Sequence, residues 1–452
     1  PTGYLTMPKI TFIGAGSTIF MRHLLGDALL MPSLRDSEIA LMDIDADRLA
    51  ESDLIARRMV DTVKTGATVS TTTSRRAALD GADFVIVSVQ IGGYEPCTVT
   101  DFEIPKQYGL RQTIADTLGI GGIMRGLRTV PFLWDLCQDM TELCPDAVML
   151  QYVNPMAINC WAIRERFPDI QTVGLCHSVP NTVFELTHDL DIPIADVRYR
   201  VAGINHVAFF LNFEQRMANG GWRDLYPDLR RQYAEGLIPK ENPVRPRCPN
   251  LVRYEMMNQL GYFLTESSEH FAEYCPWFIK DGRDDLIEQY GIPLDEYPTR
   301  CEEQIAEWRA QFAELKDGAG VDVESSSEYA AVIMNAMVTN SPDSIYGNVT
   351  NNGAISNLPD DCIVEVPCMV DANGIQATGI GALPPQLATM MKTNINVQEL
   401  TVAALTEENR EHIFHAAMFD PHTAAELDVR QIRTMTDDLL KAHRDWLPGW
   451  TQ

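Results

Sequence analysis

The strongest constraint on the fold is a glycine turn between a short apolar strand and a helix near the start of the chain. Residues 9–13 are rich in β-branched and aromatic side chains, and residues 18–30 have the length and composition of a helix. This order is that of a mononucleotide-binding unit, in which N–H groups at the helix start bind a pyrophosphate. One glycine is expected to form the tight turn and the other to let the backbone approach the phosphates. The predicted dinucleotide contacts are Gly14, Ala15, Gly16 and Ser17.

An acidic residue after the second strand selects the dinucleotide. The third glycine of the fingerprint is absent, since Ile19 stands there, but residues 39–42 form a second apolar strand that leads into Asp43. An acid at this place accepts hydrogen bonds from the adenosine ribose and repels a ribose phosphate. The sequence therefore predicts NAD, rather than NADP, as a cofactor.

Composition excludes several classes of protein. A net charge of -27 over 452 residues repels nucleic acid and anionic membrane surfaces. No stretch approaches the roughly 20 apolar residues of a membrane span, and the N-terminus lacks a signal-peptide pattern. We therefore expect a cytoplasmic protein without nucleic-acid or membrane partners. Residues 1–6 are expected to lie ahead of a native start at Met7.

Three further apolar runs predict strands of a parallel sheet. Residues 83–89, 147–153 and 172–175 are near-continuous apolar runs, as parallel strands covered on both faces require. The ligand crevice of an open α/β sheet lies beyond the carboxyl ends of its strands. The side chains that follow these runs should therefore converge there: Gln90, Asn154, Cys176 and His177. Of these, Gln90 is expected to contact the cofactor.

A glycine-rich segment at residues 112–125 is predicted to be a loop. Its glycine density suits a backbone that approaches a ligand. Asp116 and Arg125 are its reactive side chains, and Arg125 is a candidate for binding substrate.

The length suggests two closely packed domains. We expect a Rossmann-like doubly wound parallel sheet, of the lactate and malate dehydrogenase type, over residues 1–198. A mixed α+β domain should follow over residues 199–452 and contribute to the substrate and metal site and to oligomer contacts. The acid-rich segment 437–443 is expected to be a solvated helix face.

Cys176 and His206 offer a thiol and an imidazole as metal ligands. Thiolate and imidazole suit borderline or soft divalent metals, and two ligands leave coordination positions that neighbouring substrate hydroxyls could fill. On residue type alone, a structural role stays open for both side chains. The ten cysteines include no Cys-x-x-Cys pair, so neither a zinc knuckle nor a dithiol redox centre is indicated.

Longer segments resemble a known enzyme family. The chain from Lys9 to Trp450 closely resembles the NAD- and manganese-dependent glycosidases of glycoside hydrolase family 4. Within that family the residues after the metal-binding cysteine vary with substrate, and Cys176-His177-Ser178-Val179 resembles the version found in members that act on α-galactosides. The segments that carry the resemblance are Phe12–Ser17, Ala40–Asp45, Gln90–Cys97, Tyr152–Met156, Gly203–His206, Asn396–Gln398 and Asp445–Trp450.

The resemblance implies a hydrolysis outside the two-carboxylate scheme. NAD oxidises the C3 hydroxyl of the sugar, which acidifies the proton at C2. A base removes that proton while Mn²⁺, or another divalent ion held by Cys176 and His206, stabilises the enediolate. The aglycone leaves by elimination, water adds and the hydride returns. The implied substrate is an unphosphorylated, melibiose-type α-galactoside, and the implied assembly is a homodimer or homotetramer.

Further roles follow from the resemblance, residue by residue. Asn154 is expected to bind sugar hydroxyls, and Asp116 to be the acid that assists departure of the glycosidic oxygen. His177 could bind a sugar hydroxyl, share the work of the acid or orient a metal ligand.

The base that removes the C2 proton departs from the family pattern. Related enzymes have a tyrosine or an aspartate at the position that aligns with Glu266. A buried glutamate whose pKa is raised can do the same work, so Glu266 is the expected base. His270 and Tyr274 are the rival candidates.

Three alternatives stay open. The same mechanism could serve another glycoside, such as an α-glucoside or a uronide. An NAD-dependent hydroxy-acid dehydrogenase would share the sheet and the glycine turn, but it would use a metal-free His and Asp pair, which Cys176 and His206 fit poorly. A non-catalytic NAD-sensing protein would have no reason to keep Cys176, His206 and Asp116 together.

Overall fold

The protein is seen here as a computed structural model that describes residues 7–316 and 320–452. Residues 1–6, expected to precede the native start, lie outside the described residues. No helix in the described ranges is long and apolar enough to cross a membrane.

One sheet of twelve strands runs through the described residues. Its parallel half consists of β1 (Lys9–Ile13), β2 (Glu38–Met42), β3 (Thr68–Thr72), β4 (Phe84–Val87), β5 (Val148–Gln151) and β6 (Thr172–Gly174). Its antiparallel half consists of β7 (Val197–Ile204), β8 (Val207–Arg216), β9 (Trp222–Asp224), β10 (Asp343–Thr350), β11 (Ile363–Asp371) and β12 (Gly374–Ala377). The strand order is β3-β2-β1-β4-β5-β6-β10-β11-β7-β8-β9, and β12 pairs with β11.

The order of the parallel half confirms the Rossmann-like prediction. The order β3-β2-β1-β4-β5-β6 is that of the doubly wound dinucleotide fold, whose switch point lies between β1 and β4. β1 and the first helix have the bounds expected from the sequence, and β2, β4, β5 and β6 lie within one residue of, or inside, the predicted runs. The domain boundary expected after residue 198 falls inside β7 and stays a prediction.

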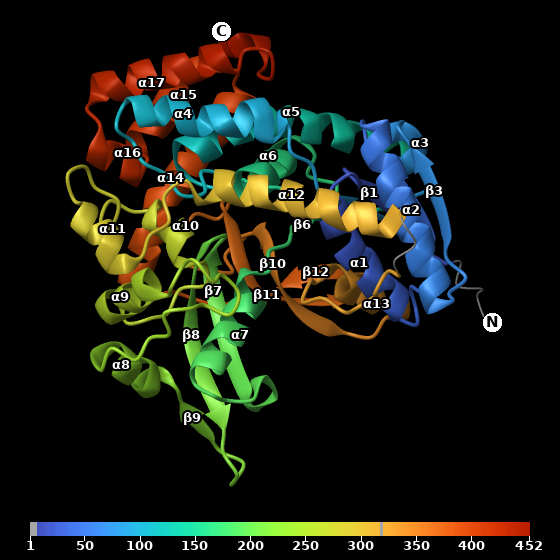
Figure 1. Ribbon diagram of the computed structural model, residues 1–452, viewed down its shortest axis with the longest axis horizontal. Helices are drawn as coiled ribbons and strands as arrows, with labels where there is room; N and C mark the ends of the chain where they lie inside the picture. Colours follow the sequence, from blue (N-terminus) through green and yellow to red (C-terminus); the bar gives the residue numbers. More distant parts are fainter. Residues whose placement is uncertain (1–6, 317–319) are drawn as a thin grey trace.

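Helices cover both faces of the parallel half and extend over the antiparallel half (Figure 1). In the first half of the chain they are α1 (Thr18–Leu30), α2 (Ala46–Val63), α3 (Arg75–Leu79), α4 (Val99–Gln107), α5 (Gly119–Leu143), α6 (Met156–Arg166) and α7 (Ser178–Asp189). Those that follow are α8 (Tyr226–Ala234), α9 (Leu251–Leu260), α10 (Ser268–Ala272), α11 (Asp284–Tyr290), α12 (Glu296–Lys316), α13 (Ala330–Thr339), α14 (Pro385–Thr406), α15 (Arg410–Phe419), α16 (Pro421–Glu426) and α17 (Val429–Ala442). Short helical turns lie at Gly93–Thr98, Ile194–Asp196 and Gly449–Thr451.

The two halves of the chain share their largest hydrophobic core. It joins Ile10 of β1 and Leu127 of α5 to Met391 of α14 and Phe414 of α15, all of them buried. In Figure 1 the C-terminal helices α15 and α17 lie beside α4 and α5, whereas β7, β8 and β9 project with α7 and α8 as a separate lobe below. The two halves are therefore joined by a shared core, while the lobe has a smaller core of its own that includes Phe210 and Phe213.

The glycine-rich segment 112–125 is only partly a loop, which corrects the sequence interpretation. Helix α5 begins at Gly119, whose φ of +71° turns the chain into the helix. A Cβ on Gly121 would lie 2.3 Å from the carbonyl oxygen of Ala115, so this glycine lets the loop rest on the helix. Arg125 is consequently a helical residue. The glycines at the start of α5 have no side chain, and this allows the preceding loop to pack directly on the helix.

Candidate active site

Cys176 and His206 meet at the carboxyl edge of the sheet. Cys176 follows β6 by two residues, and His206 lies in the two-residue turn that joins β7 to β8. The Sγ atom of Cys176 is 3.5 Å from Nε2 of His206. β10 and β11 separate the two strands, so the pairing depends on the antiparallel half of the sheet. His206 has a φ of +64°, a left-handed conformation that the tight turn imposes.

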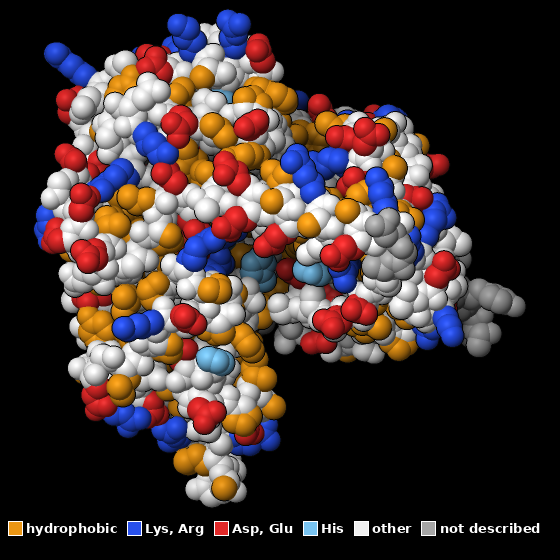
Figure 2. All heavy atoms as spheres, in the orientation of Figure 1, with side chains coloured by type: hydrophobic (Ala, Val, Ile, Leu, Met, Phe, Trp, Pro, Cys, Tyr) orange, Lys and Arg blue, Asp and Glu red, His pale blue; other side chains and the backbone are white. Residues whose placement is uncertain are grey.

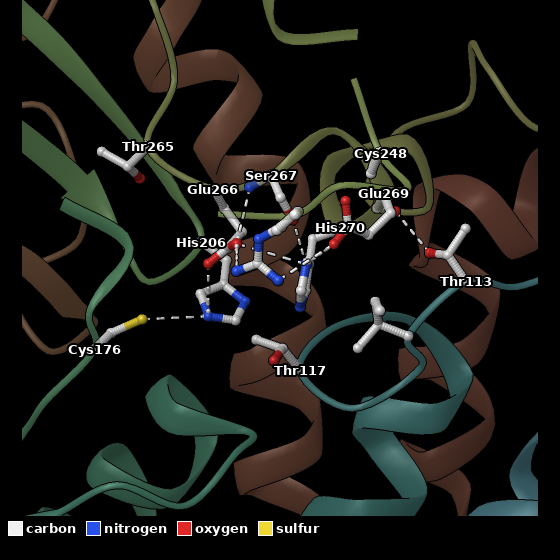
Figure 3. Close-up of polar contacts among 12 residues, drawn as sticks. Thr113, Thr117, Cys176, His206, Cys248, Thr265, Glu266, Ser267, Glu269 and His270 are labelled. Carbon is white, nitrogen blue, oxygen red and sulfur yellow. Dashed lines mark hydrogen bonds and ion pairs between the residues drawn. The ribbon is translucent and has the colours of Figure 1, made fainter. Parts of the chain in front are cut away.

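Glu266 is the third member of this cluster. Its Oε2 lies 3.2 Å from Nε2 of His206, and the possible ligand atoms of Cys176, His206 and Glu266 all lie within 4.8 Å of one another. The segment before Glu266 runs beside β8, where the Thr265 N–H donates to the carbonyl of Ala208. Figure 3 shows the three side chains pointing toward one another from separate parts of the chain.

The charges of the cluster suit a bound cation. Burial opposes ionisation of Glu266, but His206, His270 and Arg245 outweigh it and hold its pKa well below the usual range. Burial raises the pKa of the Cys176 thiol, and the carboxylate of Glu266 raises it further. Burial lowers the pKa of His206, so its imidazole is neutral at neutral pH. A divalent ion would favour the thiolate and bind the neutral imidazole.

Two side chains fix the rings around the cluster. The Tyr274 hydroxyl lies 3.1 Å from Nδ1 of His206, which leaves Nε2 directed at Cys176 and Glu266. The ring of His270 stands edge-on to that of His206, with centroids 5.1 Å apart, and its Nδ1 lies 2.7 Å from the Ser267 hydroxyl. Such partners set which imidazole nitrogen is available to a metal or a proton.

Asp116, Asn154 and Arg125 form a second group beside the cluster. Asn154 donates from Nδ2 to Oδ2 of Asp116 at 3.1 Å, and Arg125 lies 3.8 Å from the same oxygen. Burial raises the pKa of Asp116, but Arg125, His270 and His206 outweigh burial and lower it overall. Asp116 is therefore ionised at neutral pH in the ligand-free protein.

The glycine turn follows β1, at the switch point of the sheet. Gly14 has a φ of +90°, and a Cβ there would lie 2.0 Å from the carbonyl oxygen of Ser88. A Cβ on Gly16 would lie 2.6 Å from Oδ2 of Asp43, which accepts the Gly16 N–H at 2.7 Å. Ser17 makes no side-chain cap on α1, so the first N–H groups of that helix are available to ligand oxygens.

The other predicted residues lie around these groups. Gln90 follows β4 and donates to the Thr98 hydroxyl at 2.9 Å. His177 starts α7, but its half-exposed side chain lies 3.3 Å from Glu328 and outside the Cys176 cluster. Figure 2 shows a hollow between the lower lobe and the N-terminal half, with histidine side chains at its floor.

Several charged residues of the site carry no sequence motif. Arg245 lies 3.2 Å from both Glu266 and Glu269, and it comes from the irregular segment before α9. Glu365 of β11 is wholly buried, and no partner is found for either carboxylate oxygen. An isolated arginine or glutamate in a polar segment gives no signal in the sequence, because its role depends on which segments the fold brings together.

Comparison with known proteins identifies the family. Residues 9–192 match the model of the family 4 glycosyl hydrolases, and residues 201–423 match the model of their C-terminal domain. The chain belongs to glycosyl hydrolase family 4. The resemblance stated from its motifs is thereby confirmed, and membership places the protein among the enzymes that hydrolyse glycosides.

Relatives of this family 4 member match along nearly its whole length. An α-galactosidase of Bacillus subtilis is 46% identical over 98% of this chain and 100% of its own length. An α-galactosidase of Rhizobium meliloti is 33% identical over 98% of this chain and 89% of its own length. A 6-phospho-α-glucosidase from gut microorganisms, solved with NAD and Mn²⁺, is 21% identical, with a TM-score of 0.81 over 98% of this chain and 99% of its own. That likeness supports the fold.

Proposed function

We propose that this family 4 enzyme hydrolyses unphosphorylated α-galactosides of the melibiose type, with NAD and a divalent metal, Mn²⁺ in particular, as cofactors. The observation that carries the proposal is the buried Cys176–His206–Glu266 cluster beside a dinucleotide turn. The 46% identity with an α-galactosidase over the full chain supports the choice of sugar.

The residues present fit both cofactors. The turn Gly14–Ser17 packs so closely against Ser88 and Asp43 that only glycine fits at positions 14 and 16, and it leaves the start of α1 without a side-chain cap. Asp43 keeps lone pairs beyond the two that accept the N–H groups of Gly16 and Asp45. Thiolate and imidazole suit a borderline ion such as Zn²⁺, and the carboxylate adds the oxygen ligand that a harder ion such as Mn²⁺ prefers. We therefore assign NAD to the turn and the metal to Cys176, His206 and Glu266.

When bound, NAD supplies a reversible hydride acceptor and the metal a Lewis acid for charge on sugar oxygens. The chain itself must orient the sugar and move protons. Asn154 carries an amide at the strand end where sugar hydroxyls would lie, and Arg125 lies near the same oxygen of Asp116 that accepts from this amide. Together they place a hydrogen-bonding edge next to the Cys176 cluster.

We propose His270 as the acceptor of the C2 proton, in place of the expected Glu266. The carboxylate of Glu266 lies within ligand distance of Cys176 and His206, so a bound ion would engage it. Burial lowers the pKa of His270 to about 4, so its ring is neutral, and Ser267 occupies Nδ1. Because Oε1 of Glu266 lies 3.5 Å from Nδ1, the proton of the neutral ring is expected on Nδ1, and Nε2 is then the nitrogen that can accept one. Tyr274 keeps its proton, since burial raises its pKa, and its hydroxyl is engaged with His206.

Asp116 remains our choice for the group that assists departure of the glycosidic oxygen. Because its pKa is lowered in the ligand-free protein, it must gain a proton as the substrate binds. Activity on substrates with poor leaving groups should therefore fall as pH rises, whereas good leaving groups should depend less on pH.

The arginines of the site favour a neutral sugar. Arg125 lies beside Asp116, Arg245 pairs with Glu266 and Glu269, and Arg300 pairs with Glu269. Each described arginine that contacts a site carboxylate is thus neutralised by that carboxylate. A phosphate or a uronate would need an additional positive charge.

The experiment is release of nitrophenol from p-nitrophenyl α-galactoside, with NAD and Mn²⁺ each present or omitted, and with the α-glucoside in parallel. We expect hydrolysis of the galactoside only when both cofactors are present, and at least 10-fold less of the glucoside. Activity that is indifferent to NAD, or that favours the glucoside, contradicts the proposal. Net NADH formation from hydroxy acids, without sugar hydrolysis, would indicate a dehydrogenase instead.

We further propose that the enzyme works in the cytoplasm as a homodimer or homotetramer. All ten cysteines are free, and an oxidising compartment would endanger the Cys176 thiol. Exposed apolar side chains on and near the C-terminal helices, such as Phe419 and Val429, are candidates for subunit contacts. Sedimentation of the purified protein tests the assembly.

A further inference from the structure

We propose that Glu273 is a positioning residue that holds the loop before Asp116 in its working conformation. This inference rests on the proposed function, because it assigns Asp116 to the reaction. Glu273 follows α10, is 3% exposed, and turns its carboxylate toward residues 113–115 of a loop that is distant in sequence.

Three consecutive N–H groups of the loop donate to this one carboxylate. The N–H of Thr113 lies 2.8 Å from Oε2, and that of Ala115 lies 2.8 Å from Oε1. The N–H of Ile114, between them, lies 3.3 Å from both oxygens. These hydrogen bonds are buried, and they are strongest when Glu273 is ionised, which at its pKa of about 7 is about half of the molecules at neutral pH.

The loop needs such an anchor because its backbone is strained. Ala115 has a φ of +53°, a left-handed conformation that is sterically unfavourable for an L-residue. A residue stays in such a conformation only when its surroundings enforce it. Without the carboxylate, three buried N–H groups would lack partners and Ala115 would be free to relax.

Asp116 comes directly after the strained residue, so its position depends on the anchor. In the observed conformation its Oδ1 accepts from the Thr117 hydroxyl at 2.7 Å and its Oδ2 from Asn154 at 3.1 Å. A rotation at Ala115 would move both oxygens together. The carboxylate of Glu273 therefore acts on the reaction through the geometry of Asp116.

The loop has other contacts, but Glu273 is the residue that accepts its backbone N–H groups. The Thr113 hydroxyl donates to the Glu269 carbonyl at 2.6 Å, a contact visible in Figure 3. The Tyr297 N–H donates to the Thr113 carbonyl at 3.0 Å, and Gly121 packs under Ala115. These contacts hold Thr113 and the underside of the loop, but they leave the N–H groups of Ile114 and Ala115 to Glu273.

The pKa of Glu273 supports a coupling between the two carboxyls. Burial raises it to about 7, the N–H groups of the loop oppose that rise, and the charge of Asp116 adds to it. The two groups therefore influence each other across the loop, although the anchoring itself follows from the hydrogen-bond geometry.

The test is Glu273→Gln, which keeps the size of the side chain but presents an N–H₂ group to one of the loop donors. With melibiose, kcat should fall about 10- to 100-fold, because a displacement of about 1 Å at a reacting group has effects of this size. KM and the affinities for NAD and Mn²⁺ should stay within about 2-fold. The loss should be smaller with dinitrophenyl α-galactoside, which needs little help in leaving.

Two comparisons separate positioning from a general loss of structure. In an Asp116→Asn background, Glu273→Gln should add little further loss, since residues that act through one another are not additive. Multiplied losses would overturn the proposal. Asp428→Asn is the matched control, because Asp428 also accepts backbone N–H groups, at the start of α17, and should leave kcat unchanged.

Amide hydrogen exchange of residues 112–118 tests the anchor without any substrate. It should be at least 10-fold faster in Glu273→Gln than in the wild type, with unchanged exchange in α5. Unchanged exchange in the loop overturns the proposal even if activity falls. A wild type that lacks galactosidase activity, with the loop protected by Glu273, would overturn the proposed function and leave the anchor established.

Discussion

The Sγ atom of Cys176 lies 3.5 Å from Nε2 of His206, although two other strands separate the strands that carry them. β6 ends the parallel half of the sheet, and β7 begins its own hairpin beyond β10 and β11. The proposed metal site is therefore assembled across the junction of the two halves. The parallel half supplies Cys176 and the antiparallel half supplies His206, so neither half alone has both proposed metal ligands.

The first prediction concerns the thiol of Cys176. Replacement by Ala should weaken Mn²⁺ binding by on the order of 100-fold or more and abolish hydrolysis, because a metal ligand is lost. Affinity of the wild type should rise with pH, since burial raises the pKa of the thiol and binding must release its proton. Electron paramagnetic resonance of Mn²⁺ measures both effects. Cys137→Ala, at another buried cysteine, is the control and should bind the ion normally.

The second prediction distinguishes a ligand from a base at Glu266. Glu266→Gln should reduce Mn²⁺ affinity by at least 10-fold, because the carboxylate lies 3.2 Å from Nε2 of His206 and stays ionised. His270→Gln should instead preserve Mn²⁺ affinity and abolish exchange of the C2 proton with deuterated solvent. The opposite pattern, with the metal retained in Glu266→Gln and exchange lost, would return Glu266 to the role of base.

The sequence predicted those elements whose conformation depends on neighbouring residues in the chain. The glycine turn, α1 and five of the six parallel strands follow from apolar runs and turn chemistry, and the structure confirms them, whereas the polar strand β3 (Thr68–Thr72) was not predicted. Cys176 and His206 could be singled out because few residue types bind soft metals. Their separation of 3.5 Å could not be derived, since it depends on how the antiparallel strands continue the sheet.

Long-range partners account for what sequence reasoning missed. His443 belongs to a segment expected to be a solvated face, yet it is 1% exposed and lies 2.7 Å from Asp101, which also pairs with the buried Arg128. The partners come from α4 and α5, more than 300 positions away along the chain. In the same way, Arg245 and Glu273 acquire their roles only from segments that fold against them.

The third prediction concerns the glycine turn. In Gly16→Ala, the new Cβ would lie 2.6 Å from Oδ2 of Asp43 and would displace the carboxylate from the Gly16 N–H. We expect NAD to bind at least 10-fold more weakly, while Mn²⁺ affinity is unchanged. Titration of protein fluorescence with NAD measures the effect. Equal NAD affinity in the variant would show that the turn does not contact the dinucleotide.

The fourth prediction concerns stability in acid. Burial lowers the pKa of His422 to about 4, aided by the charges of Lys280 and Arg111, so its ring is neutral when folded. Below the ordinary pKa of 6.5 the unfolded chain binds a proton that the folded chain does not. The free energy of unfolding should therefore fall as pH drops from about 6.5 to about 4.

His422→Gln removes this contribution, so its melting temperature should fall less than that of the wild type between pH 7 and pH 5. A difference of about 2 °C is expected for a chain of this size. Asp420 works in the opposite sense, because burial raises its pKa to about 6 and it takes up a proton in the folded state as pH falls. The double comparison with Asp420→Asn, by calorimetry at both pH values, separates the two groups. A wild-type-like acid shift in His422→Gln would show that the imidazole is already protonated in the folded protein.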